Sequence, residues 1–175
     1  MVITHVSYTL DSPFTQIGRL SNAILLLVGD GPLRAQTEEK ARILGIKDKI
    51  IFTGVRNDVS ELMQAMDVLV FPSKNEGLPV TLVEAQTAGL PCIISDCIPK
   101  DSIITKGLVD SESLQKPACD WAKLVLARKG EERTDRSQEI RQAGFDIQDT
   151  AKWMEAFYLE KSKRQYSFNS FYASI

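Results

Sequence analysis

The hydrophobic positions of the chain fall into short, continuous runs separated by helix-like patterns. The runs are VITHV (2–6), AILLLVGD (23–30), KIIFTG (49–54), VLVFP (68–72) and CIISD (92–96). Continuous rather than alternating hydrophobicity is typical of parallel strands that are covered on both faces. Strands that alternate with helices in this way predict an α/β fold with a parallel sheet and right-handed crossovers.

Helix-like patterns fill the intervals between these runs. The predicted helices of the first half cover residues 33–44, 59–66 and 79–88. Gly45 and Gly89 stand where a helix commonly ends. Asp58 and Glu61, three residues apart, predict a capping box at the start of the second helix.

The second half of the chain is mainly helical. A short strand is expected near residues 107–109, and the predicted helices cover residues 117–129, 133–143 and 146–162. Trp121 and Trp153 occupy positions on these helices that favour packing in the core. We therefore interpret residues 1–163 as one domain that includes its C-terminal helices, followed by a tail at 164–175 without clear periodicity.

Composition narrows the class of protein. The 175 residues are 43% hydrophobic and 25% charged, with a net charge of −2, which fits a soluble domain with a sizeable core. No apolar run is long enough to span a bilayer, and no basic leader precedes the first run. The balanced charge argues against a nucleic-acid partner. Cys92, Cys97 and Cys119 lack CxxC spacing and are expected to be reduced thiols of a cytosolic protein, with Cys92 packed in a strand.

Candidate chemistry lies where the predicted strands end. Four loops, at residues 29–32, 54–57, 73–79 and 96–100, follow four strands and are expected to converge at one edge of a parallel sheet. The helix that begins near Pro79 offers backbone N–H groups to a phosphate, and Arg56 could add a charge-assisted contact. The sequence contains no HExxH, paired CxxC, DxD, GxGxxG or Walker pattern, so no metal or cofactor is predicted.

Two carboxylates, Glu76 and Glu84, stand out with seven residues between them. Glu76 lies in a Gly/Pro-bearing loop after a predicted strand, and Glu84 interrupts the apolar run VTLVEA. Each also has a simpler interpretation, because Glu76 could be an exposed loop residue and Glu84 could lie on a solvated helix face.

Other candidate residues have simple interpretations as well. Gly29 and Gly31 could simply make a tight turn and have no role in binding. His5, the only histidine, is expected to be a packed or edge residue, which argues against a Ser–His or Cys–His nucleophile.

Taken together, four segments resemble one family of enzymes. They are LLLVGDGPL (25–33), IIFTGVR (50–56), DVLVFPSKNEGLPVTLVEAQTAGLPCIISD (67–96) and AGFDIQDTAKWMEAFYLE (143–160). Over residues 23–160 the chain resembles the donor-binding domain of retaining, family-4 glycosyltransferases with the GT-B fold, whose E-x7-E motif matches Glu76 to Glu84. The flanks are most similar to enzymes of capsular or exopolysaccharide biosynthesis.

The resemblance implies a fold and a ligand. The fold would be a Rossmann-like parallel sheet with helices on both faces and a helical C-terminal extension, which is half of a GT-B enzyme. The ligand would be a nucleotide-sugar donor, commonly a UDP-sugar, with no cofactor. Glu84 would bind the ribose hydroxyls, and Glu76, the implied catalytic residue, would contact the donor sugar or its phosphate-proximal region. The implied donor-binding residues are Gly29, Gly31, Gly54, Val55, Arg56, Gly77, Leu78, Pro79, Val80, Thr81 and Glu84.

The chain departs from the family near its N-terminus. In one alignment Ile17–Leu20 is the start of a phosphate clamp whose downstream Lys is missing. In the other, VITHV is the first strand, SYTLDSP replaces the clamp loop and Phe14–Asn22 is a shortened helix. We adopt the second alignment, which leaves Arg19 without a functional role.

The family's N-terminal acceptor domain has no counterpart in the sequence. It would be supplied in cis or in trans, and the aromatic residues Trp153, Phe157 and Tyr158 would pack across the junction and be partly exposed without it. The full protein is expected to transfer a sugar without a metal to a glycan or lipid-linked acceptor, in the cytoplasm or at the inner face of the membrane. By itself the domain is expected to bind nucleotide better than it transfers sugar. Alternatives are a non-catalytic nucleotide-sugar-binding module and a structural subunit whose site has decayed.

Overall fold

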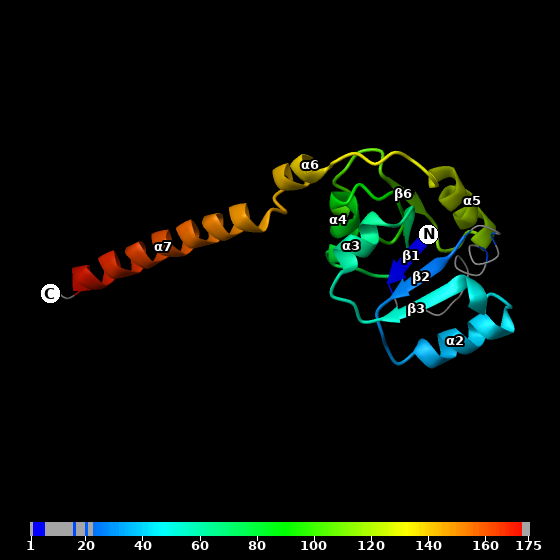
Figure 1. Ribbon diagram of the computed structural model, residues 1–175. Helices are drawn as coiled ribbons and strands as arrows, with labels where there is room; N and C mark the ends of the chain where they lie inside the picture. The colour runs from blue at the N-terminus through cyan, green and yellow to red at the C-terminus, as the bar shows by residue number, and fades with distance from the viewer. Residues whose placement is uncertain (1, 6–15, 17–19, 21–22, 173–175) are drawn as a thin grey trace. The chain divides into compact units, whose positions relative to one another are not determined.

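A computed structural model describes residues 2–5, 16, 20 and 23–172 (Figure 1). Residues 1–137 form one compact unit and residues 138–175 a second, and each is described by itself. The predicted loop SYTLDSP lies outside the described residues. The same holds for Arg19 and for nearly all of the expected helix Phe14–Asn22.

The first unit is built on a parallel sheet. Its strands are β1 (Val2–His5), β2 (Leu25–Val28), β3 (Ile50–Gly54), β4 (Val68–Phe71), β5 (Cys92–Ser95) and β6 (Val109–Glu112). They lie in the order β3-β2-β1-β4-β5-β6, and every neighbouring pair is parallel. The predicted parallel α/β sheet is therefore confirmed.

Strand β1 occupies the centre of this sheet. Val2 aligns with Leu25 of β2 on one side and with Val68 of β4 on the other, so the assignment of VITHV as the first strand is confirmed. The chain proceeds outward from β1 to β3 in one direction and from β4 to β6 in the other. The order reverses between β1 and β4, which is where α/β sheets of this kind open a crevice for ligands.

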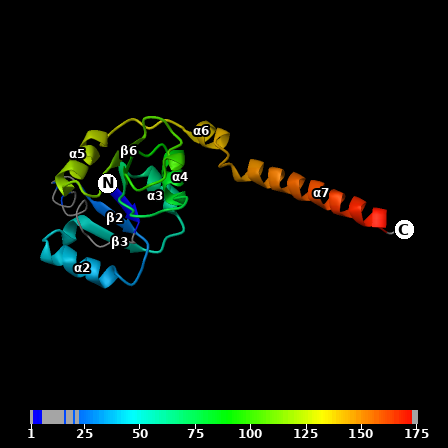
Figure 2. The ribbon, with the colours of Figure 1, turned by 180° about the vertical axis from the view of Figure 1, so that it is seen from behind.

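Helices cover both faces of the sheet because successive strand residues point to opposite sides. Leu25 and Leu27 pack with Trp121 in one core cluster, whereas Leu26 and Val28 pack with Leu82 in the other. Helices α2 (Arg34–Ile43) and α5 (Ala118–Arg128) cover the first side, and α3 (Val59–Gln64) and α4 (Val80–Thr87) cover the second. Figures 1 and 2 show these two pairs on opposite sides of the strands.

The capping box predicted for the second helix is wrong. Asp58 is the N-cap residue of α3, but its side chain makes no cap hydrogen bond. Its carboxylate instead accepts two hydrogen bonds from the guanidinium of Arg56. The charged neighbour outcompetes the backbone N–H groups because hydrogen bonds between two ionised groups are the stronger kind.

Residues 133–134 cross the C-terminal ends of α3 and α4. Arg133 donates from Nη1 to the Met63 carbonyl at 2.8 Å, and its Nη2 donates to the Met66 carbonyl. Burial lowers the pKa of Arg133, and these carbonyls compensate the buried charge as they would any cation at a helix C-terminus. Gly89, just after α4, lies so close to the carbonyl of Thr134 that a side chain at this position would clash with it.

The second unit contains α7 (Ile147–Tyr172) and nearly all of α6 (Ser137–Gln142). Helix α6 is shorter than predicted, while α7 continues as one helix through most of the segment interpreted as a tail. No helix in the described part of the chain combines the length and apolar character needed to cross a membrane.

The tryptophans behave differently from each other. Trp121 is fully buried, as predicted, but Trp153 is 66% exposed, so its assignment to the core is wrong. Trp153 stacks on Phe157 with ring centroids 5.5 Å apart, and Phe157 contacts Tyr158 edge-on. The expected exposure of these three aromatic residues is confirmed.

Gly89→Ala should destabilise the first unit more than Gly45→Ala. Both glycines follow a helix and have positive φ, 61° and 68°, which costs alanine about 1–2 kcal/mol. A Cβ at Gly89 would also lie 2.5 Å from the Thr134 carbonyl oxygen, whereas one at Gly45 meets nothing within 4 Å. We expect an additional cost of about 1–3 kcal/mol for Gly89→Ala in urea unfolding. Equal losses in the two variants would contradict the close crossing of residue 134.

The three thiols should differ in reactivity. Cys92 is fully buried in β5 and its Sγ lies 3.0 Å from the Leu90 carbonyl, and burial raises the pKa of its thiol well above the usual range. Cys97 and Cys119 are exposed. An aromatic disulfide reagent at mildly alkaline pH should therefore modify Cys97 and Cys119 in the native chain and Cys92 only after denaturation. Cys92→Ser should leave the native reaction unchanged, and rapid native modification of Cys92 would contradict its burial.

Candidate functional site

The four candidate loops lie at one edge of the sheet. They follow β2, β3, β4 and β5, and parallel strands place their carboxyl ends together. Hydrogen bonds join neighbouring strand ends in two pairs: Gly29 N–H donates to the Gly54 carbonyl at 2.9 Å, and the hydroxyl of Ser95, the last residue of β5, donates to the Ser73 carbonyl. The two pairs stand on either side of β1, at the reversal of strand order.

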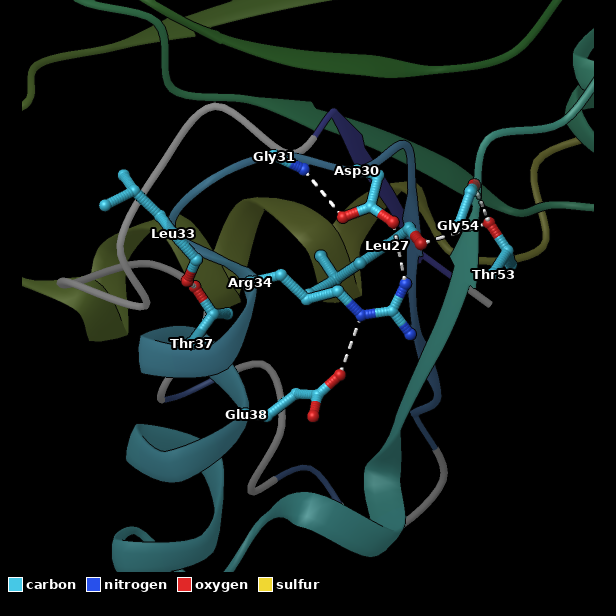
Figure 3. Close-up of polar contacts among 9 residues, drawn as sticks. All are labelled: Leu27, Asp30, Gly31, Leu33, Arg34, Thr37, Glu38, Thr53 and Gly54. Atoms are coloured by element: carbon cyan, nitrogen blue, oxygen red, sulfur yellow. Dashed lines mark hydrogen bonds and ion pairs between the residues drawn. The ribbon is translucent and has the colours of Figure 1, made fainter.

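Gly29 and Gly54 need their backbone freedom. Gly29 has φ 126° and Gly54 has φ 69°, and residues other than glycine rarely adopt such positive φ values. Their contact is the last one between β2 and β3, and beyond it both chains leave the sheet as loops. Gly31 lies in the same loop and donates its N–H to Asp30 Oδ1 at 2.8 Å (Figure 3).

Arg34, which sequence reasoning missed, connects this loop to α2. Figure 3 shows its guanidinium between Asp30 and Glu38, with Arg34 Nη1 3.1 Å from Asp30 Oδ2 and Nε 2.8 Å from Glu38 Oε1. These hydrogen bonds, first the one that Arg34 donates to Glu38 and then the one to Asp30, raise the pKa of Arg34. It also lies over the Phe52 ring, 6.0 Å from its centroid. The spacing of Asp30, Arg34 and Glu38, four residues apart along a helix start, was the available signal.

The loop after β3 presents Val55 to solvent, with 77% of its surface exposed. Arg56, expected to reach a phosphate, pairs instead with Asp58 at 2.7 Å from Nε to Oδ1. The hydrogen bond between them raises the pKa of Arg56 and lowers the pKa of Asp58. A phosphate would have to compete with Asp58 for this guanidinium.

Glu76 lies partly buried in the loop that joins β4 to α4. Ser73 Oγ donates to Glu76 Oε1 at 2.7 Å. Residues 74–75 and 77–78 on either side are exposed, so the carboxylate is more enclosed than its neighbours. Ser73 was not among the predicted site residues, although serine side chains in turns commonly form hydrogen bonds with groups a few residues away.

Helix α4 begins at this edge without a side-chain cap. Its N-cap residue is Pro79, and the first intrahelical bonds run from the N–H groups of Leu82 and Val83 to the Pro79 carbonyl. The N–H groups of Val80 and Thr81 precede these bonds and carry the partial positive charge of the helix start. Such an end is suited to bind an anion.

Glu84 lies one turn into α4 and is exposed. It lines an open depression of about 190 Å³ together with Ser60, Gln64, Thr87 and Ala88, which come from α3 and from α4 and its end. The residues that surround its carboxylate are therefore polar or small.

Gln86 holds α4 in place from its buried face. Its side chain is fully buried, and Nε2 donates to the carbonyls of Leu82 and Ser102 at 3.2 and 2.8 Å. Oε1 accepts from the N–H groups of Ile104 and Thr105 at 2.8 and 3.0 Å. One amide thus joins α4 to the segment that follows β5.

Within the described ranges, no three His, Cys, Asp or Glu side chains gather closely enough to hold a metal ion. Glu76 and Glu84 stand in two separate settings, because Glu76 is partly buried beside Ser73 of its own loop and Glu84 lines the open depression beside α3.

Sequence comparison identifies the family. Residues 13–139 match the family described as "Glycosyl transferases group 1". The chain belongs to this family. The chain is 42% identical over 127 residues to the putative glycosyltransferase EpsF of Bacillus subtilis (strain 168), covering 71% of the chain and 33% of EpsF.

Two further relatives match shorter stretches of the chain. The Vi polysaccharide biosynthesis protein VipC/TviE of Salmonella typhi is 47% identical over 68 residues, 39% of the chain and 12% of that protein. The UDP-Gal:alpha-D-GlcNAc-diphosphoundecaprenol alpha-1,3-galactosyltransferase of Escherichia coli is 36% identical over 78 residues, 44% of the chain and 20% of that protein.

Solved structures show the same fold in GT-B glycosyltransferases. Sucrose-phosphate synthase from Thermosynechococcus elongatus superimposes with a TM-score of 0.73 and 19% identity, over 93% of the chain and 46% of the synthase. Anabaena Alr3699/HepE in complex with UDP gives a TM-score of 0.64 and 19% identity, over 89% and 48%. The resemblance to half of a GT-B enzyme is confirmed, and the chain spans about a third of EpsF and under half of these structures.

Gln86→Leu should destabilise the first unit strongly. It removes the partner of two N–H groups and two carbonyls, and a buried polar group left unsatisfied costs about 1–3 kcal/mol. We expect a loss of roughly 3 kcal/mol or more in urea unfolding. Thr87→Ala, at the exposed next position of the same helix, should change stability by no more than about 0.5 kcal/mol. Similar small effects for both substitutions would contradict the role of Gln86.

Proposed function

We propose that this chain is the donor-binding part of a glycosyltransferase that uses a UDP-sugar and builds a polysaccharide or lipid-linked glycan. The observation that carries the proposal is the uncapped start of α4 beside the Glu76 loop, where the strand order reverses. The UDP bound to HepE and the UDP-Gal named for the Escherichia coli enzyme support the donor. The Vi polysaccharide protein and the diphosphoundecaprenol-linked acceptor support the acceptor class.

The donor diphosphate would lie at the start of α4. The backbone of Gly77–Thr81 would hold it through the N–H groups of its residues other than Pro79, and the helix dipole would stabilise the charge that develops on the leaving diphosphate. This stabilisation requires no metal ion. We therefore assign the transfer as metal-independent, with no cofactor besides the donor itself.

The nucleoside would lie between the ends of β2 and β3 and the depression beside α3. Glu84 can accept hydrogen bonds from two neighbouring ribose hydroxyls, because a carboxylate offers two acceptor oxygens. Gly54, Val55 and Arg56 would line the base, with the guanidinium face of Arg56 available while its edge pairs with Asp58.

The donor sugar would lie beside Glu76. Breaking the bond between the sugar and the diphosphate creates an oxocarbenium-like centre, and a nearby carboxylate stabilises that positive centre. Glu76 would therefore act electrostatically and by positioning the sugar, in a reaction that retains the configuration of the donor.

The other half of the catalytic cleft would come from outside this chain. The chain covers under half of its structural relatives, so an acceptor domain would be supplied in the same polypeptide or by a partner. The transfer would take place in the cytoplasm or at the inner face of the membrane. The chain alone would bind nucleotide better than it transfers sugar.

Replacing each carboxylate separately tests the donor site. Glu84→Ala should weaken the binding of both UDP and UDP-sugar by about 10–100-fold, because hydrogen bonds to a charged group contribute roughly 1.5–3 kcal/mol. Glu76→Ala should leave UDP affinity within about twofold and weaken only the UDP-sugar, since it lies beside the sugar. Isothermal titration calorimetry of the chain with UDP, UDP-galactose and UDP-glucose measures both effects.

Glu155→Ala, which removes an exposed glutamate of α7 that belongs to none of the candidate loops, is the matched control and should bind like the parent. Removing divalent ions with EDTA should leave the affinities unchanged. Parent-like binding by both Glu76→Ala and Glu84→Ala would refute the site. Absence of binding at millimolar UDP would favour a decayed structural subunit, and binding without transfer in the presence of the acceptor half would favour a non-catalytic module.

A further inference from the structure

The carboxylate of Glu76 is held by a buried hydroxyl. Ser73 is fully buried, and its Oγ lies 2.7 Å from Glu76 Oε1 and 3.3 Å from the Asn75 carbonyl oxygen. A serine hydroxyl has only one proton to donate. The shorter contact has the length of a strong O–H···O bond to an ionised acceptor, so the proton points to Glu76.

Ser73 is itself fixed by the neighbouring strand. Ser95, the fully buried last residue of β5, donates its hydroxyl to the Ser73 carbonyl. The register of β4 and β5, with Phe71 opposite Ile94, brings these two strand ends together. The next residue, Asp96, donates its N–H to the Glu112 carbonyl at 3.0 Å, which ties the end of β5 to β6.

These contacts form one chain of hydrogen bonds from the sheet to the loop carboxylate. Without it, Glu76 would be a flexible side chain between exposed residues of a short loop. Side chains of this length lose much rotamer freedom when a ligand orders them, and ordering them beforehand removes that cost from binding.

We propose that Ser73 is a positioning residue for Glu76, anchored by Ser95. It holds Oε1 so that Oε2 is the carboxylate oxygen presented to the donor sugar. The contact with the sugar rests on the function proposed above, whereas the ordering of Glu76 by Ser73 does not.

The ordering is measured without any ligand. Three-bond NMR couplings that report the χ1 angle of Glu76 should indicate one rotamer in the parent chain and an average of rotamers in Ser73→Ala. The matched control is Ser102→Ala, which removes another buried serine hydroxyl that donates to a carbonyl, that of Pro99. It should leave the Glu76 couplings unchanged. Parent-like couplings in Ser73→Ala would overturn the proposal.

The effect on the donor is measured by a double-mutant cycle. Ser73→Ala should weaken UDP-sugar binding by about 3–10-fold and leave UDP within about twofold. In the Glu76→Ala background, the same substitution should have no further effect. An equal loss in both backgrounds would show a merely structural role and overturn the proposal.

Ser95→Ala provides a second variant should Ser73→Ala fail to fold, because it keeps the Ser73 hydroxyl and releases only its carbonyl. It should also broaden the Glu76 rotamers, by less than Ser73→Ala, and unchanged couplings would count against the anchor. If Glu76→Ala binds the UDP-sugar like the parent, the assignment of Glu76 to the sugar is refuted, and the couplings still decide whether Ser73 orders Glu76.

Discussion

Burial of the central strands on both faces is the constraint on which this structure depends. Leu25–Val28, Val68–Phe71 and Cys92–Ile94 are almost completely withdrawn from solvent. A charged side chain within these strands would have no partner, so charged groups are confined to the strand ends, the helix surfaces and the connecting loops. Because all strands run parallel, the candidate loops gather at a single edge. The chemistry proposed for this chain is located there by the same burial that stabilises the sheet.

Hydrogen bonds connect the polar groups at that edge, first between the strand ends and then from the strand ends to the loops. The strand ends are joined in pairs by backbone and serine contacts, and the loops then carry the carboxylates. The helix start at Val80 completes the arrangement with unpaired N–H groups. Groups from neighbouring elements are therefore already in place to bind an anion and sugar hydroxyls, and the sheet would not need to rearrange.

Much of the fold was predictable from the sequence because continuous apolar runs leave few alternatives. The sheet and the helices on both of its faces followed from the period of the pattern alone. The end of α7 was not predictable, because RQYSFNSFY lacks the periodicity on which the prediction depends. Trp153 was misassigned because a helical position predicts a face but not what covers it.

The candidate site was predictable at the level of loops and less so at the level of side chains. Convergence of the strand ends follows from topology, but the partners of Arg56 depend on competition between Asp58 and other acceptors. Ser73 and Arg34 were missed for a related reason. Their roles come from short contacts between side chains, which residue spacing suggests only weakly.

The crossing at residues 133–134 has a consequence for the depression that Glu84 lines. Arg133 donates a hydrogen bond to the Met63 carbonyl in α3, while the carbonyl of Thr134 lies close to Gly89, which follows α4. The depression beside Glu84 is bounded by these same two helices. Gln64 and Ala88 line it and stand next to Met63 and Gly89, the residues that the crossing contacts, so the same crossing that closes off the two helices also fixes the spacing of the walls beside Glu84.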